Sequence, residues 1–290
     1  MIEFFRKLLK KIKKKPKVLV IILAETRAHE LTFKRFQKNV LEVLDADLAV
    51  CVGNKEKTKA KVNDPFHKAA KYHWIINEPD DFGDAYDFAC KNSKVQKNDW
   101  RSAVTVIKDQ LFGGVKVSQH LGSAGILIFF RWFLMYKLQT TGVLQDYDFF
   151  IVTRSDYFYE HKHPVVTFEQ NANKIWIPKG EDYGGITDRH IVVPRNLMYD
   201  AMSLMDILLH NPRKMIDEMK HHKLWNLEQY IHHHFKKKNL LDKIVRFPRM
   251  MYAVRLPHGT TRWAMGSYNK DVNMIVKYET EYRDVLNYKI

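Results

Sequence analysis

An uninterrupted apolar run near the start of the chain, Lys17 to Ala24 (KVLVIILA), does most to limit what this sequence can fold into. Runs of aliphatic and β-branched residues without polar alternation are typical of strands that are buried on both faces of a parallel sheet. A helical pattern follows over residues 31–44, and a second apolar run covers residues 46–52. A strand, a helix and a strand in this order predict the βαβ beginning of an α/β domain.

The rest of the chain continues the alternation of strands and helices. We expect strands at 72–76, 148–153 and 174–178, a long apolar helix at 123–138, shorter helices at 84–91, 100–111, 195–209, 212–221 and 227–237, and strand-like pieces at 243–247 and 251–256 before a polar tail. No repeat or low-complexity linker divides the sequence. It therefore predicts one α/β domain over residues 17–290, with a mixed central sheet flanked by helices.

Basic residues are concentrated at the N-terminus. The formal net charge of the chain is +15, and residues 1–17 contain eight Lys or Arg against one Glu. Apolar residues recur in the same segment at helical spacing until Pro16, namely Ile2, Phe5, Leu8, Leu9 and Ile12. The pattern predicts a basic amphipathic helix over residues 1–16, whose residues 1–15 bind an anionic membrane surface. A solvated basic tail is the alternative interpretation.

Several classes of protein are disfavoured by what the sequence lacks. No run of about 18 uncharged apolar residues could span a bilayer, and the N-terminus has no signal-peptide core or cleavage site. The two cysteines, Cys51 and Cys90, favour a reducing compartment. We therefore expect a cytoplasmic protein that associates peripherally with a membrane. The motifs of P-loop kinases, dinucleotide-binding dehydrogenases and zinc sites are also missing from the sequence.

The end of the predicted strand at 148–153 (DFFIVT) carries the most informative polar residues, Arg154 and Asp156. Ligands of open α/β sheets bind at the carboxyl ends of strands. Two residues apart in an extended segment, these side chains would face the same side. A diphosphate leaving group needs a divalent ion held by carboxylates, or Arg and Lys, to neutralise its charge. A salt-bridged surface turn would explain the same residues without a ligand.

Four segments, in order, resemble the nucleotide-sugar-dependent glycosyltransferases of the GT-A fold, particularly those that bacteria and large DNA viruses encode for surface polysaccharide and glycan synthesis. They are IILAETRAHELTFKRFQKNVLEVLDADLAV, YDFFIVTRSDYFY, KIWIPKGEDYGGITDRHIVV and WNLEQYIHHHFKKKNL, and the resemblance covers about residues 18–245. The second segment is similar to a strand followed by an R-x-D version of the family's DxD metal motif. The resemblance implies a single GT-A-like, Rossmann-like domain.

The resemblance also implies roles for individual residues in binding the donor. The nucleotide pocket would be lined by Ala24, Glu25, Thr26 and Arg27, and the leaving diphosphate would be bound by Arg255 and Arg262. Asp156 would hold Mn²⁺ or Mg²⁺, with Arg154 in place of the first acid of DxD, and His258 would be an additional metal ligand. Because one acid is lost, metal binding could be weaker, or Arg154 could meet the diphosphate directly. A plain loop histidine is the alternative for His258.

An inverting transfer needs a carboxylate that takes the proton of the acceptor hydroxyl. Asp188, which follows Gly184 and Gly185, is the first candidate for this base, and Glu228 is the second. Glycines at this point would let the backbone approach a sugar closely. Asp is also a frequent helix or turn cap, and a retaining enzyme would need no such base.

These observations predict a glycosyltransferase, of the hexosyl- or pentosyltransferase kind. It would move a sugar from a nucleoside-diphosphate sugar, with a UDP-sugar favoured by the resemblance, to a growing glycan or lipid-linked glycan. A basic nucleic-acid-binding protein is the first alternative. It is disfavoured because no nucleic-acid-binding motif is present, so no nucleic-acid partner is expected. A catalytically inactive scaffold with the same fold is the second alternative, supported by the lost acid of DxD.

Overall fold

The computed structural model describes residues 15–54, 64–95, 99–105, 110–120, 122–221, 225–258 and 263–288. The amphipathic helix predicted over residues 1–16 therefore falls almost entirely outside the described residues, as does Arg262. Both remain predictions from the sequence.

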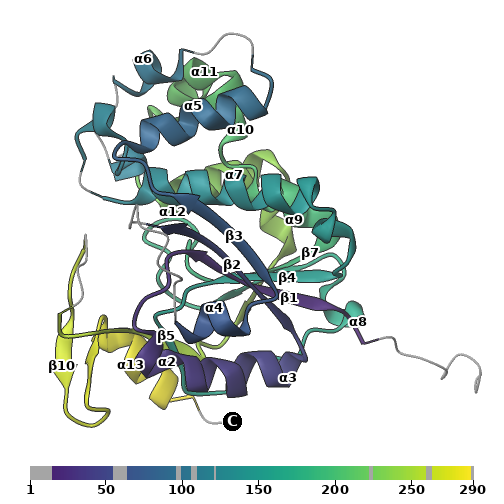
Figure 1. Cartoon of the computed structure of the whole chain (residues 1–290), viewed down its shortest axis with the longest axis vertical. Coiled ribbons are helices and arrows are strands. Elements are labelled where there is room, and N and C mark those ends of the chain that lie inside the picture. The colour runs from purple at the N-terminus through teal and green to yellow at the C-terminus, as the bar shows by residue number, and fades with distance from the viewer. Residues whose placement is uncertain are drawn as a thin grey trace, which may run out of the picture.

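A mixed sheet forms the centre of the molecule (Figure 1). Within the described ranges it has seven strands in the order β3-β2-β1-β4-β7-β6-β8. The strands are β1 (Val18–Ala24), β2 (Asp47–Asn54), β3 (Tyr72–Asn77), β4 (Phe149–Thr153), β6 (Ile175–Pro178), β7 (Ile191–Pro194) and β8 (Ile244–Phe247). The first four are parallel, β7 is antiparallel to both β4 and β6, and β8 is parallel to β6. The order 3-2-1-4 is that of a Rossmann-like half, and the predicted fold class is confirmed.

β1 lies in the middle of the parallel strands and is buried on both faces, as its sequence predicts. Its alternate side chains enter two separate cores, Leu19, Ile21 and Leu23 on one face and Val18, Val20 and Ile22 on the other. One face is covered by α7 (Ala124–Thr140), with α9 (Arg195–Met202) and α12 (Leu227–Lys237) beside it. The other face is covered by α2 (His29–Phe36), a π-helical turn (Gln37–Leu41), α3 (Glu42–Leu44) and α4 (Pro65–Ala69).

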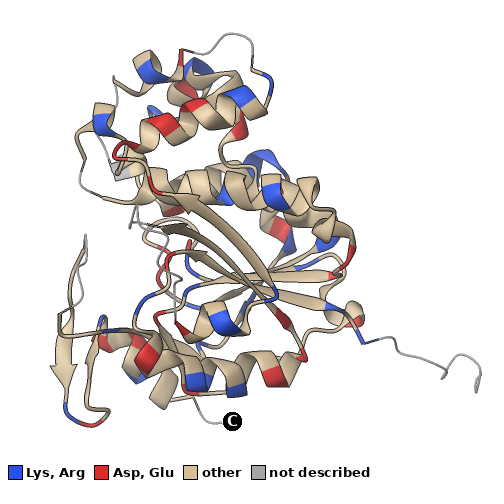
Figure 2. Cartoon of the chain, viewed as in Figure 1, with Lys and Arg blue, Asp and Glu red and all other residues tan. Residues whose placement is uncertain are grey.

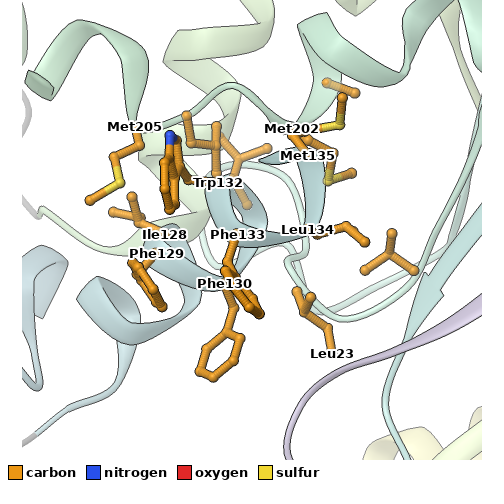
Figure 3. Close-up of a cluster of buried hydrophobic side chains, with 14 of the residues drawn as sticks. Leu23, Ile128, Phe129, Phe130, Trp132, Phe133, Leu134, Met135, Met202 and Met205 are labelled. Atoms are coloured by element: carbon orange, nitrogen blue, oxygen red, sulfur yellow. The ribbon is translucent and has the colours of Figure 1, made fainter. Parts of the chain in front are cut away.

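α7 is apolar on nearly all sides because it is covered by the sheet on one side and by helices on the other (Figure 3). Phe130, Phe133 and Leu134 are among its fully or almost fully buried side chains. The buried charge of Arg131 interrupts this surface. The helix that the sequence predicts at 123–138 is thus confirmed, and Arg131 requires a partner.

An outer layer lies beyond α7, formed by α5 (Phe82–Asn92), α6 (Trp100–Val104), α10 (Asp206–His210) and α11 (Pro212–Met219). The single helix predicted at 195–209 is wrong, because α9 ends at Met202 and α10 begins at Asp206. Part of the helix predicted at 100–111 lies outside the described residues, and the part that is described forms α6 and a 3₁₀ turn (Gln110–Phe112). Other short elements are α8 (Phe168–Asn171) and 3₁₀ turns at Lys116–Ser118, Val143–Gln145 and Leu241–Lys243.

A second, antiparallel sheet gathers the C-terminal strands against the end of β4. In the part of the chain that is described, its order is β10-β11-β9-β5, with β5 (Tyr157–Tyr159), β9 (Met251–Arg255), β10 (Ser267–Asn269) and β11 (Met274–Val276). α13 (Glu279–Leu286) packs on β9. The predicted polar tail is therefore wrong. Its apolar residues are sparse but periodic, and Val276, Tyr282 and Val285 form a small core with β9.

Three observations bear on the predicted location and partners of the protein. None of the described helices is long and apolar enough to cross a membrane. Lys and Arg are interspersed with Asp and Glu over α2, α3 and α5 in the view of Figure 2. Cys51 and Cys90 are buried free thiols.

Candidate active site

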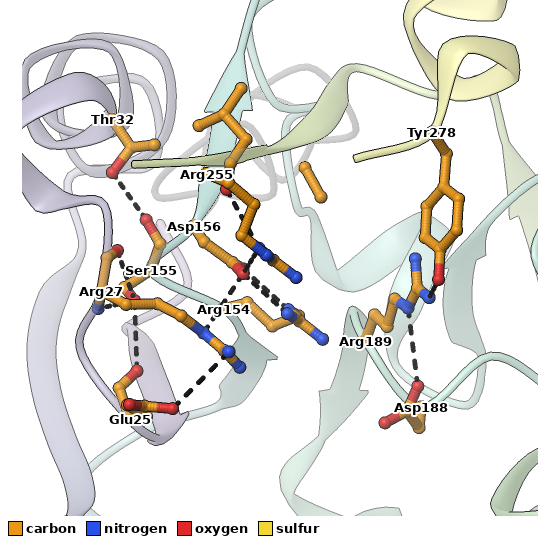
Figure 4. A network of polar contacts seen from close by, with 12 residues as sticks. Glu25, Arg27, Thr32, Arg154, Ser155, Asp156, Asp188, Arg189, Arg255 and Tyr278 are labelled. Carbon is orange, nitrogen blue, oxygen red and sulfur yellow. Dashed lines mark hydrogen bonds and ion pairs between the residues drawn. The ribbon is translucent and has the colours of Figure 1, made fainter. Parts of the chain in front are cut away.

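The loops that follow β1 and β4 are joined by hydrogen bonds at the carboxyl ends of these two strands. β1 ends at Ala24, whose φ of 74° turns the chain out of the strand. The Ser155 side chain, just after β4, accepts a hydrogen bond from the backbone N–H of Arg27 at 2.8 Å. The carbonyl of Ser155 accepts one from Thr32 Oγ1 at 2.6 Å (Figure 4). The loop at 25–27 is thereby held beside Arg154 and Asp156.

The carboxylate of Asp156 is completely buried and is surrounded by three guanidinium groups (Figure 4). Arg154 donates to both of its oxygens, from Nε at 2.8 Å and from Nη2 at 2.7 Å. Arg255 donates to Oδ2 from β9, and Arg27 Nε lies 3.3 Å from the same oxygen. Burial alone would raise the pKa of Asp156, but the charges of Arg154, Arg27 and Arg255 hold it well below its usual range. The acid is therefore ionised and fully paired.

This donor set does not fit a divalent cation at Asp156. Mn²⁺ and Mg²⁺ need oxygen ligands with available lone pairs, whereas both oxygens of Asp156 already accept from arginines. A cation there would also meet three positive charges. His258, the predicted additional ligand, is exposed and does not line the cavity. Among the described residues, no three His, Cys, Asp or Glu side chains come together as a metal site.

A cavity of about 370 Å³ opens over these residues. Five residues that the sequence predicts for donor binding line it, namely Ala24, Glu25, Arg27, Arg154 and Arg255. Thr26 does not, because its hydroxyl turns away and donates to Asp64 Oδ2 at 2.6 Å. The cavity therefore lies where the carboxyl ends of β1 and β4 meet, as the sheet topology predicts.

A second cavity, of about 190 Å³, adjoins the first. It is lined by the rings of Tyr183, Trp263 and Tyr278 and by the carboxylate of Glu228. The two cavities share several lining residues, Asp188 among them, so they form one continuous cleft. Glu228 lines only the second cavity, whereas Asp188 lies where the two meet. The structure thus brings together both carboxylates that were predicted as the base.

The two carboxylates influence each other electrostatically. Burial, and then the charge of Asp188, raise the pKa of Glu228 to about 7. The backbone of Asp188 is positioned by Arg131, the buried charge of α7, whose Nη2 donates to the Asp188 carbonyl at 2.7 Å. A carboxyl group that titrates near neutral pH in a cleft is suited to accepting and releasing a proton.

Gly185 serves a different purpose from the predicted one. The Ile186 N–H donates to the carbonyl of Glu228 at 3.0 Å, and a Cβ on Gly185 would overlap that carbonyl. The glycine therefore allows its loop to approach the first turn of α12, not a sugar. Asn226 caps the same helix and donates to the Tyr183 carbonyl at 3.0 Å, which fixes the loop from a second point.

Two cationic residues of the cleft were not predicted from the sequence. Arg189 is buried and bonded to Glu281 at 2.8 Å, to Glu181 and to the hydroxyl of Tyr278 at 3.2 Å. Lys277 lines both cavities and is 6% exposed. Arg189 directly follows Asp188, and Lys277 follows Val276. Nothing nearby in the sequence indicates which side chains each of them contacts.

Comparisons with known proteins do not identify a family for this chain. No protein-family model matches the chain, and no curated protein sequence matches it. Among solved structures, the apo form of mouse xyloside xylosyltransferase 1 is similar with a TM-score of 0.35 and 9% sequence identity, over 80% of this chain and 85% of that chain. A likeness this distant says nothing about chemistry, which depends on the side chains of the cleft.

Proposed function

We propose that the protein is a glycosyltransferase that moves a sugar from a nucleoside-diphosphate sugar, a UDP-sugar in the first instance, to a hydroxyl of a growing glycan. The observation that carries the proposal is the continuity of two unlike cavities. The first lies at the carboxyl ends of β1 and β4, and it alone is lined by Arg27 and Arg255. The second alone is lined by Tyr183, Tyr278 and Glu228. An anionic donor and a hydroxylated acceptor would need these two environments side by side.

The donor diphosphate is proposed to lie in the first cavity. Arg27, Arg154 and Arg255 contact the carboxylate of Asp156, and Arg27 also pairs with Glu25 at 3.6 Å, so three positive charges meet two negative ones. The remaining positive charge suits a diphosphate, and preorganised guanidinium groups would stabilise the charge that develops when this group leaves. The sugar would then point toward Asp188, where the cavities meet.

The acceptor is proposed to lie in the second cavity, between the exposed faces of Tyr183 and Trp263. Its hydroxyl oxygen attacks the anomeric carbon, the bond from that carbon to the diphosphate oxygen breaks, and the nucleoside diphosphate departs with the bonding electrons. The hydroxyl proton passes to a carboxylate of the Asp188 and Glu228 pair. Glu228 is suited to hold that proton because its pKa is about 7.

The direct test measures release of UDP or GDP from a panel of nucleotide sugars by the purified full-length chain. We expect release with one of these donors, accelerated by an acceptor glycan and reduced roughly 100-fold or more by Glu228→Gln, as for loss of a general base. Glu42→Gln, an exposed change on α3 across the sheet, is the matched control. Binding of UDP or GDP without any turnover would favour the inactive scaffold, and no binding of either would contradict the proposal.

Residues 1–15 are proposed to hold the enzyme on an anionic membrane, near a lipid-linked acceptor. The support is their sequence alone, an apolar stripe among lysines. Co-sedimentation with vesicles containing phosphatidylserine tests it. Binding to these vesicles, but not to neutral ones, should be lost when residues 1–14 are deleted.

A further inference from the structure

The guanidinium groups around Asp156 outnumber the carboxylates that pair with them. Arg27, Arg154 and Arg255 contact Asp156, and Glu25 Oε2 lies 3.6 Å from Arg27 Nη1. Arg189 does not add to this excess, because it is paired with Glu181 and Glu281. Three arginines therefore meet two carboxylates at this point of the first cavity.

Lys277 brings to the same place an amino group that becomes a further cation when it is protonated. It follows β11, is 6% exposed, and lines both cavities. Its Nζ lies 4.5 Å from the centre of the Tyr278 ring, and within the described residues it forms no ion pair with a carboxylate. A buried ammonium without an acid is strongly disfavoured unless a ligand supplies the missing charge.

Arginines and a lysine therefore occupy the place where the resemblance to glycosyltransferases implies a metal ion. Both oxygens of Asp156 accept hydrogen bonds from guanidinium groups, and a divalent cation there would meet three positive charges, so the one acid of the R-x-D motif does not fit a metal site. We propose that the cleft binds the diphosphate of its donor without a metal ion, and that Lys277 supplies the charge that the ion would otherwise supply. The identity of the donor rests on the proposed function, whereas the anion site rests on the cations alone.

Binding of the diphosphate is then coupled to uptake of a proton. Burial, and then the charges of Arg154, Arg189 and Arg255, lower the pKa of Lys277 to about 6. The negative charge of Asp156 acts in the opposite direction and raises this pKa. The other ionisable side chains that line the two cavities are those of Glu25, Arg27, Glu78, Tyr183, Asp188, Glu228 and Tyr278. With this pKa, Lys277 is mostly neutral at pH 7 in the free protein. A bound diphosphate raises the pKa of Lys277, and the lysine then takes up a large part of one proton at pH 7.

Calorimetric titration of the full-length chain tests the inference. The probes are inorganic pyrophosphate and UDP, in EDTA at pH 7, in two buffers with different ionisation enthalpies. We expect binding without metal, uptake of most of one proton, and affinity that falls as the pH rises from 6 to 8. Lys277→Met should weaken pyrophosphate binding roughly tenfold or more and abolish the uptake from this group.

The variant Lys277→Arg tests the positive charge at position 277 separately from the change in protonation of this residue. Arginine stays protonated at all accessible pH values, so this variant should bind pyrophosphate and take up no proton at position 277. Lys236→Met, an exposed change on α12, should behave like the unaltered chain. Thermal melting checks that each variant is folded, and removing a buried unpaired charge is not expected to destabilise the protein.

The outcomes distinguish this inference from the proposed function. Pyrophosphate binding that appears only after Mn²⁺ or Mg²⁺ is added would overturn the inference, even if sugar transfer is then observed. Metal-free binding that is equally tight and equally proton-coupled in Lys277→Met would also overturn it. Metal-free, proton-coupled binding that Lys277→Met weakens would support it, even if no nucleotide sugar is ever turned over.

Discussion

The substitution Asp156→Asn should change the stability of the protein differently for two possible roles of Asp156, a metal ligand and the counter-ion of an arginine cluster. In the structure the carboxylate is completely buried and contacts Arg27, Arg154 and Arg255. Asn keeps the shape but removes the charge. Three guanidinium groups would then face one another without a counter-ion. A metal ligand in a metal-free protein, in contrast, can usually be neutralised without loss of stability.

The size of the effect follows from the burial. Removing one partner of a buried ion pair destabilises a protein by about 3–5 kcal/mol. For a chain of this length the entropy of unfolding is about 0.6 kcal/mol per kelvin, so the melting temperature should fall by roughly 5–8 °C. Asp45→Asn is the control, because Asp45 pairs with Lys15 at 3.1 Å on the surface and should change stability by less than about 1 kcal/mol.

Thermal unfolding at pH 7 in EDTA, with and without pyrophosphate, is the assay. The anion should raise the melting temperature of Asp156→Asn more than that of the unaltered chain, because it replaces part of the missing charge. A variant that melts at the same temperature as the unaltered chain would refute the interpretation of Asp156 as the buried counter-ion.

Three further predictions concern the acceptor side. The raised pKa of Glu228 means that its proton stabilises the fold, fully below about pH 4.5 and no longer above about pH 7. Glu228→Gln should therefore be more stable than the unaltered chain at pH 8 by up to about 3 kcal/mol, in urea unfolding, and equal to it at pH 4; a lower stability at pH 8 would contradict this. Gly185→Ala should lower both turnover and melting temperature because its Cβ overlaps the Glu228 carbonyl, whereas Gly142→Ala, at φ 76° with open space around it, should lower only stability, by about 1 kcal/mol. Tyr183→Ala, which removes a ring that lines only the second cavity, should raise KM for the acceptor with little change in KM for the donor, and an equal rise in both would argue against an acceptor site there.

The parts of the fold that could be predicted are those buried on all sides. β1 and α7 are recognisable because neither leaves room for polar residues on a solvent face. α13 was missed because only one of its faces is covered, by a small core around Tyr282 and Val285. The break between α9 and α10 was missed because apolar residues continue across it, with Leu204 and Met205 fully buried.

The location of the candidate site could be predicted from the sequence, but the contacts between its residues could not. The ends of β1 and β4 had to meet once the sheet order was known, which brings Arg27 close to Arg154 and Asp156. That three arginines surround Asp156 depends in part on Arg255, which lies 99 residues further along the chain. No local pattern predicts such a pairing. One signal for the acceptor side was available in Arg131, a charged residue in the middle of a mostly apolar helix, which donates to the Asp188 carbonyl.

The tie between Asp156 and Arg255 also has a consequence for how the molecule is made. The parallel strands β1 to β4 precede residue 154, whereas β9, which carries Arg255, emerges about 100 residues later in synthesis. Until then Asp156 has only Arg27 and Arg154 as partners, and Lys277 has not yet been synthesised. Because pairing over such sequence separations is slow, the central sheet can collapse well before the cleft exists. A chain released before residue 251 would have the Rossmann-like half and yet bind no diphosphate.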